Sequence, residues 1–378
     1  MYTLSEVCSL ITDGSHFSPE DEGTGYPMLS VKDMRDDGFD YSSCKYVGED
    51  AFKTLVENGC KPQINDVVVA KDGSYLKAAF SIKENLNIVL LSSIAILRPK
   101  LDILYPDYLS YYFRSEAVYR TVSLNYITGT ALKRIILQGI RKLQINLPTI
   151  EEQKMIVKKL DKINCLISLR KKQLQKLDDL VKARFVEMFG DAKQEDTLLN
   201  LCNIIDYRGK TPEKVEDGLP FITAKNVRMH QLSIEPREYI SKETYNSVMT
   251  RGFPREGDVV FTTEAPLGNV CRLPHFDTEF YVGQRIVTLQ TKKLIPAYLE
   301  YALDTDEFRR KIEGKSSGST VTGIRVRLLE QLTIPVPNRA SQEQFSAFVS
   351  QVDKSKLSIQ QSLEKLETLK QSLLQQYF

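Results

Sequence analysis

The sequence predicts an α+β fold in which two globular α/β units alternate with two long helices as a tandem internal repeat. Short β-type runs punctuated by Gly, Asp and Asn fill two stretches of about 145 residues each, as turns between strands require. A long segment without Pro or Gly follows each stretch, and the second half of the chain repeats the first. We therefore expect globular units at 1–148 and 191–340, and long helices at 149–190 and 341–378.

The duplication is visible as short motifs that return in the same order. The run 66-DVVVA-70 returns as 258-DVVFT-262, and 106-PDYLSYY-112 returns as 296-PAYLEYA-302. The offset drifts from 194 near the start of each copy to 189 at 143-LQINLP-148 and 332-LTIPVP-337, and we place the two helix starts at an offset of 192. Chance explains one such pair but not an ordered series, so the chain is expected to contain two copies of one plan.

Both long segments have the signature of a capped helix with a coiled-coil seam. Thr149 with Glu152, and Ser341 with Gln344, have the spacing of a capping box. Apolar residues then recur at steps of four and three over about five heptads. One small unit cannot bury so long a seam, so the two helices are expected to pack on each other, antiparallel if a two-fold axis relates the copies. The seam residues are Ile156, Leu160, Ile163, Ile167, Leu174, Leu177, Val349, Val352, Ile359, Leu363 and Leu366.

Bulk composition excludes several classes of protein. The chain is 42% hydrophobic and 26% charged, which is typical of globular domains, and no apolar run reaches the length of a membrane span. Its six cysteines include no C-x-x-C pair, which argues against a structural zinc site or a disulfide framework. No N-terminal secretion signal is apparent. We therefore expect a cytoplasmic protein whose cysteines are small buried hydrophobes.

Nucleic-acid binding would have to depend on local loops, because the net charge is only +2. The stretch 129-GTALKRIILQGIRK-142 is basic and has no acidic residue, and 318-GSTVTGIRVR-327 is its counterpart. Gly and Ser/Thr let backbone N–H groups approach phosphates, which Lys and Arg neutralise. Ordinary solvated turns are the alternative reading of these loops. Polar residues in equivalent loops of the two copies are candidates for base contacts.

The expected DNA-binding residues lie in four kinds of loop. The roles of Gln284 and Arg285, beside a strand, stay open. The candidates are Ser15, His16, Lys32, Lys71, Ser74, Tyr75, Lys77, Thr130, Lys133, Arg134, Arg208, Lys210, Thr211, Lys225, Asn226, Thr263, Glu264, Ser319, Thr320 and Arg325.

The chain resembles the specificity subunits of type I restriction–modification systems along nearly its whole length. The motifs 148-PTIEEQ-153 and 184-RFVEMFGD-191 are similar to the family's central conserved region, and 375-QQYF-378 to the end of its distal one. The globular units resemble target recognition domains, through motifs such as 71-KDGSYLK-77 and 262-TTEAPLGN-269. The distal helix lacks counterparts of Lys154, Lys158 and Lys159, so partner binding is expected to differ between the two helices.

The resemblance implies a mechanism for the whole complex. Each recognition domain reads one half of a bipartite target in double-stranded DNA, and the helix pair sets the spacer and docks two methyltransferase subunits. Those subunits would use S-adenosylmethionine to methylate adenine, and separate restriction subunits would use ATP and magnesium to translocate and cut DNA. The resemblance implies no cofactor on this chain.

Missing motifs agree with a chain that is not an enzyme. Adenine methylation would need [DN]-P-P-[YF], and the sequence has no P-P dipeptide. Neither G-x-G-x-x-G nor a P-loop occurs, and His16, His230 and His275 lack metal-ligand spacing. The alternatives left open are an equivalent subunit of another restriction–methylation type, a stand-alone two-domain DNA-binding regulator, and an enzyme in its own right.

Overall fold

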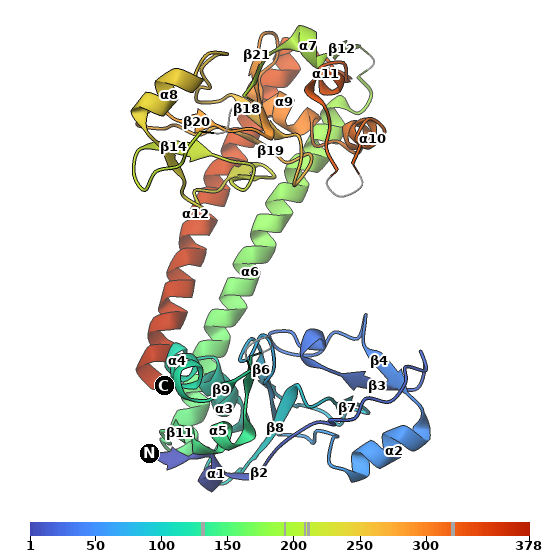
Figure 1. Cartoon of the computed structure of the whole chain (residues 1–378), viewed down its shortest axis with the longest axis vertical. Helices are drawn as coiled ribbons and strands as arrows, with labels where there is room; N and C mark the ends of the chain where they lie inside the picture. The colour runs from blue at the N-terminus through green and yellow to red at the C-terminus, as the bar shows by residue number, and fades with distance from the viewer. Residues whose placement is uncertain (130–132, 193, 208, 210–211, 319–321) are drawn as a thin grey trace. The chain divides into compact units, whose positions relative to one another are not determined.

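The computed structural model describes residues 1–129, 133–192, 194–207, 209, 212–318 and 322–378. The chain forms two compact units. Unit 1 comprises Met1–Lys172 and Gln360–Phe378, and unit 2 comprises Gln173–Ile359. Helix α6 (Ile150–Phe189) therefore begins in unit 1 and ends in unit 2, and helix α12 (Arg339–Tyr377) begins in unit 2 and ends in unit 1 (Figure 1).

Unit 1 is built on two main sheets. The larger is antiparallel, in the order β2 (Cys8–Asp13), β8 (Ile94–Pro99), β5 (Val67–Ala70), β6 (Ala79–Ser81). The smaller has the order β4 (Lys45–Val47), β3 (Tyr26–Leu29), β7 (Val89–Leu90), with β3 parallel to β7. Two short pairs join β1 (Tyr2–Thr3) to β11 (Gln144–Ile145) and β9 (Ile127–Thr128) to β10 (Arg134–Ile135). The helices of this unit are α1 (Leu4–Val7), the 3-10 turn η1 (Val31–Asp33), α2 (Glu49–Glu57), α3 (Pro106–Phe113), α4 (Glu116–Asn125) and α5 (Leu137–Lys142).

Unit 2 repeats this plan strand for strand in its main sheets. The larger sheet has the order β13 (Cys202–Asp206), β21 (Ile286–Thr291), β18 (Val259–Thr262), β19 (Val270–Arg272). The smaller has the order β17 (Tyr239–Ile240), β14 (Leu219–Ile222), β20 (Tyr281–Val282), again with one parallel pair. Strand β12 (Glu195–Thr197) pairs with β22 (Thr333–Pro335), and β15 (Val227–Arg228) with β16 (Gln231–Leu232). Its helices are α7 (Leu198–Leu201), α8 (Lys242–Val248), α9 (Pro296–Ala302), α10 (Asp306–Glu313) and α11 (Val326–Leu329).

The shared strand order has a physical consequence. In the large sheet of unit 1, β8 runs antiparallel to both β2 and β5. The loops after β2 and β5 therefore meet the loop before β8 at one edge of the sheet. The loops after β13 and β18 meet the loop before β21 in the same way. The predicted α+β class and the internal duplication are thus confirmed by the structure.

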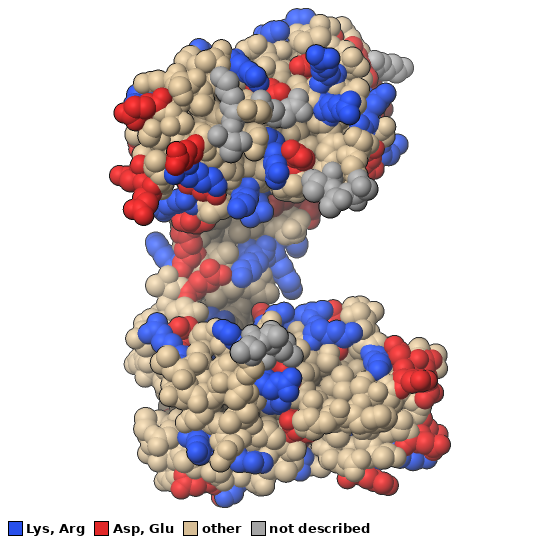
Figure 2. Space-filling model, in the orientation of Figure 1, with Lys and Arg blue, Asp and Glu red and all other residues tan. Residues whose placement is uncertain are grey.

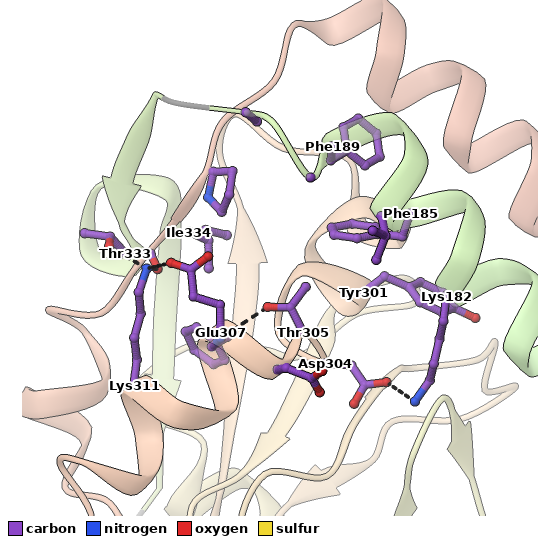
Figure 3. A pocket seen from close by; sticks show the side chains of 16 residues that line it. Lys182, Phe185, Phe189, Tyr301, Asp304, Thr305, Glu307, Lys311, Thr333 and Ile334 are labelled. Atoms are coloured by element: carbon purple, nitrogen blue, oxygen red, sulfur yellow. Dashed lines mark hydrogen bonds and ion pairs between the residues drawn. The ribbon is translucent and has the colours of Figure 1, made fainter.

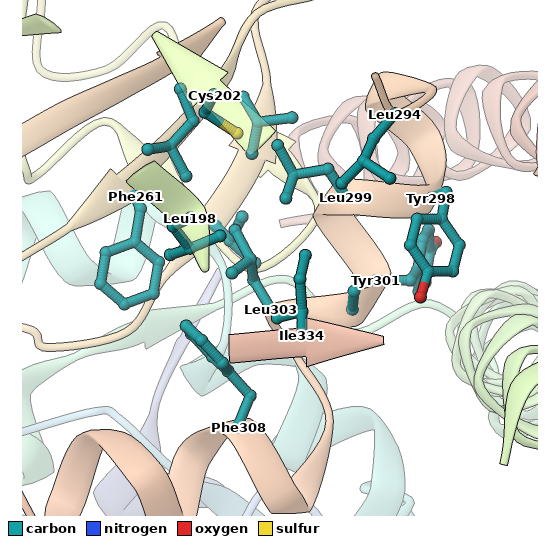
Figure 4. Packing of buried hydrophobic residues seen from close by; sticks show 14 of the residues in the cluster. Leu198, Cys202, Phe261, Leu294, Tyr298, Leu299, Tyr301, Leu303, Phe308 and Ile334 are labelled. Carbon is teal, nitrogen blue, oxygen red and sulfur yellow. The ribbon is translucent and has the colours of Figure 1, made fainter. Parts of the chain in front are cut away.

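The main core of unit 2 lies between its large sheet and its helices. Phe261 of β18 packs at 6.3 Å, edge to face, on Phe308 of α10 (Figure 4). Tyr298 of α9 is fully buried, and its hydroxyl donates to the carbonyl of Pro335 at 2.7 Å. Aromatic pairs of this kind stabilise a core beyond their buried area.

Both long helices belong to the core of each unit. In unit 2, Phe185 and Phe189 of α6 contact Phe345 of α12 at 5.3 and 5.5 Å between ring centroids. In unit 1, Leu160 of α6 and Leu374 of α12 share one buried cluster. The helices complete both cores because their apolar seams have no other place to be buried.

Polar contacts along the seam, together with the contact of Phe185 and Phe345 in unit 2, show the direction of the two helices within each unit. In unit 1, Lys171 of α6 lies 3.2 Å from Glu367 of α12, while Lys159, nearer the start of α6, contacts Tyr377, nearer the end of α12. In unit 2, Lys356 of α12 lies 2.5 Å from Asp178 of α6. The helix segments in each unit are therefore antiparallel, as the sequence predicted.

The seam residues are buried to different degrees. Leu160, Ile163, Ile167, Val349 and Val352 are buried. The remaining predicted positions are half-buried: Ile156, Leu174, Leu177, Ile359, Leu363 and Leu366.

The start of the second long helix differs from the prediction. Thr149 and Glu152 form the expected capping box, because Thr149 N donates to the Glu152 carboxylate at 2.8 Å and Glu152 N donates to Thr149 Oγ1 at 3.3 Å. In α12, however, Asn338 is the cap, and its Oδ1 accepts from Ser341 N at 2.9 Å. The capping box at Ser341 was wrong because an Asn after Pro337 caps the helix three residues earlier.

Two buried glutamines mark the true equivalence of the helix starts. Gln153 Oε1 accepts from Tyr105 N at 2.8 Å, and Gln342 Oε1 accepts from Ile295 N at 2.9 Å. Each glutamine also donates to the carbonyl of the proline that precedes the helix. The offset is therefore 189 here, as at the preceding prolines, and does not return to 192.

The cysteines are mostly small core residues. Cys8, Cys202 and Cys271 are buried, and burial raises the pKa of each thiol to about 12. Cys165 on α6 is exposed, so the expectation that all six are buried was wrong for this one.

We expect Gln342→Ala to lower the free energy of unfolding of unit 2 by about 1–3 kcal/mol, because it leaves the part-buried N–H of Ile295 without an acceptor. Urea denaturation followed by circular dichroism measures this. Gln344→Ala, two residues further along the helix and exposed, is the matched control and should change stability little. Equal effects of the two substitutions would contradict the anchoring role.

Candidate nucleic-acid interface

Four segments of unit 1 meet at one edge of its large sheet. We call this surface loop face 1 and define it by residues 13–16, 71–77, 91–93 and 133–135. Backbone hydrogen bonds hold it together: Ser92 N donates to Ser15 O at 2.9 Å, Lys71 N to Ser93 O at 2.9 Å, and Gly73 N to Lys133 O at 2.7 Å. Segments about 120 residues apart in sequence thus form one polar surface.

The side chain of Lys71 is an internal part of loop face 1. It is only 7% exposed, and its Nζ lies 3.4 Å from Asp13 and 3.1 Å from Asp72. Two carboxylates neutralise one ammonium, so Lys71 fixes the loops against each other. The ammonium group of Lys71 therefore holds loop face 1 together from inside, and base contact is not expected of it.

Other expected residues of loop face 1 are accessible. His16 is 78% exposed and lies 3.5 Å from Asp13, whereas Ser15 is buried and bonds to Phe17. Ser74 and Lys77 are exposed. Loop face 1 therefore offers a mixture of donors and acceptors.

Tyr75 connects loop face 1 to helix α4. Its hydroxyl lies 3.1 Å from Ser123, and its ring stacks on Tyr119. The hydrogen bond with Ser123 lowers the pKa of Tyr75, and the charge of Lys133 lowers it further.

Lys133 and Arg134 both have exposed side chains at loop face 1. Arg134 pairs backbone to backbone with Asp72, and Ile135 N donates to Lys71 O at 2.9 Å. The two cations are thus held on ordered backbone beside the end of β5.

A short turn beside the smaller sheet is repeated in both units. Asp33 closes it in unit 1 by accepting from Ser30 N at 2.8 Å, and Asn226 does so in unit 2 by accepting from Thr223 N at 2.9 Å. Lys32 and Lys225 are exposed at equivalent places on these turns.

Asn226 itself has no side-chain group left for a base. It is buried, and its Nδ2 donates to the carbonyls of Ser233 and Pro236 at 3.1 and 3.0 Å. The Asn226 amide therefore shapes the turn, and base contact is not expected of it.

The corresponding edge of unit 2 is loop face 2, defined by residues 263–269, 283–285, 317–318 and 322–325. Thr263 N donates to Arg285 O at 2.9 Å, and Ile324 N donates to Thr263 O at 2.9 Å. Thr263 is buried, so it contributes backbone bonds, whereas Arg325 is exposed at the start of α11. Arg285 lies 3.4 Å from Glu264.

Six expected residues fall outside the part of the chain that the structure describes. They are Thr130, Arg208, Lys210, Thr211, Ser319 and Thr320.

Sequence reasoning did not place Arg285, Asp13 and Asp72 among the site residues. The repeat carried a signal for Arg285, because it is the equivalent of Ser93 at an offset of 192. No sequence pattern identified Asp13, which reaches Lys71 only across the folded sheet.

Charge is unevenly distributed on the face drawn in Figure 2. Lys and Arg side chains gather on unit 2 around α10 and α11, and Asp and Glu gather at the end of unit 1 that carries α2. Although the net charge of the chain is only +2, local surfaces are basic enough to attract a polyanion.

A buried ionic network supports unit 2 beneath these surfaces. His230 is 9% exposed, and its ring lies 3.1 Å from Glu300 through Nδ1 and 3.0 Å from Asp304 through Nε2. Arg272 joins Glu300 at 2.5 Å to Asp353 of α12 at 2.8 Å, and Lys182 of α6 lies 2.9 Å from Asp304 (Figure 3). The network therefore ties β19 and α9 to both long helices.

His230 is the titrating member of the network. Burial acts to lower its pKa, but hydrogen bonds to Asp304 and Glu300 outweigh that effect and the pKa is raised. Both ring nitrogens face carboxylates, and both can donate only when the ring is protonated, which is why these contacts raise the pKa. Burial acts to raise the pKa of Asp304, but its hydrogen bonds with His230, Lys182 and Arg309 leave that pKa well below its usual range.

A groove of about 320 Å³ lies next to this network between α6, α10 and β22. Phe185, Phe189 and Ile334 form its apolar part, and Lys311 bonds to Thr333 at one side (Figure 3). Within the described residues, no three His, Cys, Asp or Glu side chains are grouped so that they could hold a metal ion. In the same part of the chain, no helix combines the length and apolar character that crossing a membrane requires.

Comparison with known proteins decides the family. The family model described as the type I restriction modification DNA specificity domain matches twice, at residues 1–179 and 194–370. The chain belongs to this family. It is 22% identical over 381 residues to the MjaVIII specificity subunit of Methanocaldococcus jannaschii, covering 92% of this chain and 87% of that protein.

Two solved structures support the fold. One, from work on complex assembly and conformational transition of the type I R-M system, has a TM-score of 0.57 at 19% identity and covers 100% of this chain and 96% of the other. The S subunit from M. genitalium has a TM-score of 0.54 at 15% identity, covering 100% and 95%. The expected membership of the type I specificity family is confirmed.

The network makes the stability of unit 2 depend on pH. Because the folded pKa of His230 is raised above its ordinary 6.5, its contribution is complete below that value and is lost as the pH rises through the folded pKa. We expect His230→Asn, which tolerates the positive φ of 56°, to be less stable below pH 6.5 and to lose less stability as the pH rises above 6.5.

Urea denaturation at several pH values measures this effect. His275→Asn is the control, because His275 is 70% exposed and bonds to Glu256 at the surface. Parallel pH profiles for wild type and His230→Asn would show that His230 does not carry the dependence.

Proposed function

We propose that this chain is the DNA specificity subunit of a type I restriction–modification complex and is not itself an enzyme. Unit 1 reads one half of a bipartite target through loop face 1, and unit 2 reads the other half through loop face 2. The observation that carries the proposal is that the two units share one frame of strands but present different side chains on equivalent loops. A shared strand order that carries different loop side chains fits a DNA target whose two halves differ in sequence.

The loops supply both kinds of contact that such a reader needs. Lys133, Arg134, Lys32, Lys225 and Arg325 are exposed cations beside strand ends, where they neutralise phosphates. His16, Ser74, Lys77 and Glu264 lie on the same faces and offer donors or acceptors to base edges. Phosphate contacts set the register, and base contacts set the sequence.

The long helices set the distance between the half-sites. Each begins in one unit and ends in the other, and each is part of both cores. Their exposed faces dock two methyltransferase subunits, which carry S-adenosylmethionine. Restriction subunits that use ATP and magnesium complete the cytoplasmic complex.

Methylome sequencing of a host that carries the complete system tests this function. Wild type should methylate a motif with two separated halves. Inserting one heptad into both α6 and α12 adds about 10 Å of helix, so the tolerated spacer should lengthen, by at most about three base pairs, with both half-sites unchanged.

A heptad inserted into α6 alone is the control, since it shifts one seam against the other and should abolish methylation. Altered half-sites with an unchanged spacer would refute the role of the helices. No motif that depends on this gene would refute the proposed function as a whole.

We expect Lys133→Ala with Arg134→Ala to weaken DNA binding by a similar factor on all sequences. Loss of two phosphate contacts should reduce the slope of log K against log salt by about two. Fluorescence anisotropy at several salt concentrations measures this. The control is Lys53→Ala with Lys100→Ala, which removes two cations from α2 and from the opposite edge of the sheet. Lost preference for one base pair with an unchanged slope would contradict phosphate contact.

A further inference from the structure

Arg285 has an unusual backbone at the centre of loop face 2. Its φ is +73°, a left-handed conformation that side chains other than Gly rarely adopt, and it comes directly before β21. Strained residues of this kind persist where the surrounding structure holds them, often at functional sites. Here Arg285 O accepts from Thr263 N at 2.9 Å, which fixes the residue against the end of β18.

The side chain of Arg285 is presented outward beside one carboxylate. It is 53% exposed, and its Nε lies 3.4 Å from Oε1 of Glu264, which is 36% exposed. Glu264 is itself held, because its backbone bridges to Gly323. The contact is made through Nε, and about half of the guanidinium-bearing side chain remains exposed.

Unit 1 differs at the same position. Ser93 is the equivalent residue, since Lys71 N donates to Ser93 O as Thr263 N donates to Arg285 O. Its short side chain turns inward, and Ser93 Oγ accepts from Val31 N at 3.0 Å. The outward arginine is therefore a feature of unit 2 alone among these equivalent positions.

An arginine and a glutamate side by side complement the major-groove edge of a G·C pair. Guanine presents N7 and O6, two acceptors that a guanidinium fork contacts together, and cytosine presents an N4 amine that a carboxylate accepts. An A·T pair presents the adenine N6 donor where the fork requires an acceptor. A phosphate fits less well, because Glu264 would repel it.

We propose that Arg285 and Glu264 read one G·C pair in the half-site recognised by unit 2, with Arg285 on the guanine and Glu264 on the cytosine. This inference rests on the proposed function and names its specificity-determining residues. Lys225 and Arg325, which are exposed on or beside the same face, supply phosphate contacts there.

Methylome sequencing of hosts carrying the complete system with Arg285→Lys tests the proposal. Lysine keeps the charge but lacks the fork, so discrimination at one G·C position of one half-site should fall by about 5-fold to 150-fold. The other half-site and the spacer should not change. Glu264→Gln, which keeps an acceptor for the N4 amine, should retain the preference better than Glu264→Ala.

Arg255→Ala is the matched control, because Arg255 is exposed at the opposite end of β18. A wild-type motif without G·C in either half would overturn the proposal. So would an unchanged motif in Arg285→Lys, or an even loss of methylation at all sites. Absence of any gene-dependent motif in wild type would instead refute the proposed function.

Discussion

The packing of α6 against α12 is the interaction on which the rest of the structure depends. Neither helix has a core of its own, and each buries its seam partly in unit 1 and partly in unit 2. Phe185, Phe189 and Phe345 show this most clearly, since they join both helices to Tyr298 of α9. Separating the helices would open both cores, so the chain cannot lose its helix pair and keep its recognition units intact.

The two units share one fold but use different polar contacts to attach it to the long helices. Gln153 and Gln342 anchor the helix starts in the same way, but the networks beside them differ. In unit 2, Arg272 and Asp353 connect a strand to α12 by charge, whereas in unit 1 Tyr111 bonds to Asp161 and Asn164 of α6. The frame is thus maintained by backbone and apolar packing, which leaves the loops free to differ.

The sequence was sufficient to predict the duplication, the α+β class, the long helices and the family, because repeats and heptads are periodic signals. It misplaced the cap of α12, since Asn338 and Ser341 are both good cap residues and only the packing of Gln342 distinguishes them. It also predicted that Lys71 and Asn226 contact DNA bases, whereas their polar groups bond to neighbouring residues inside the protein. Contacts such as Lys71 with Asp13 arise across a sheet and have no local pattern to reveal them.

The account as a whole requires that the two units contact different halves of one target. Lys32 and Lys225 occupy equivalent exposed turns. A photoreactive amino acid placed at each position, in the assembled complex bound to DNA that contains its methylated motif, shows directly which half-site each unit contacts. We predict that position 32 cross-links to one half-site and position 225 to the other. Cross-linking of both positions to the same half-site would contradict the account.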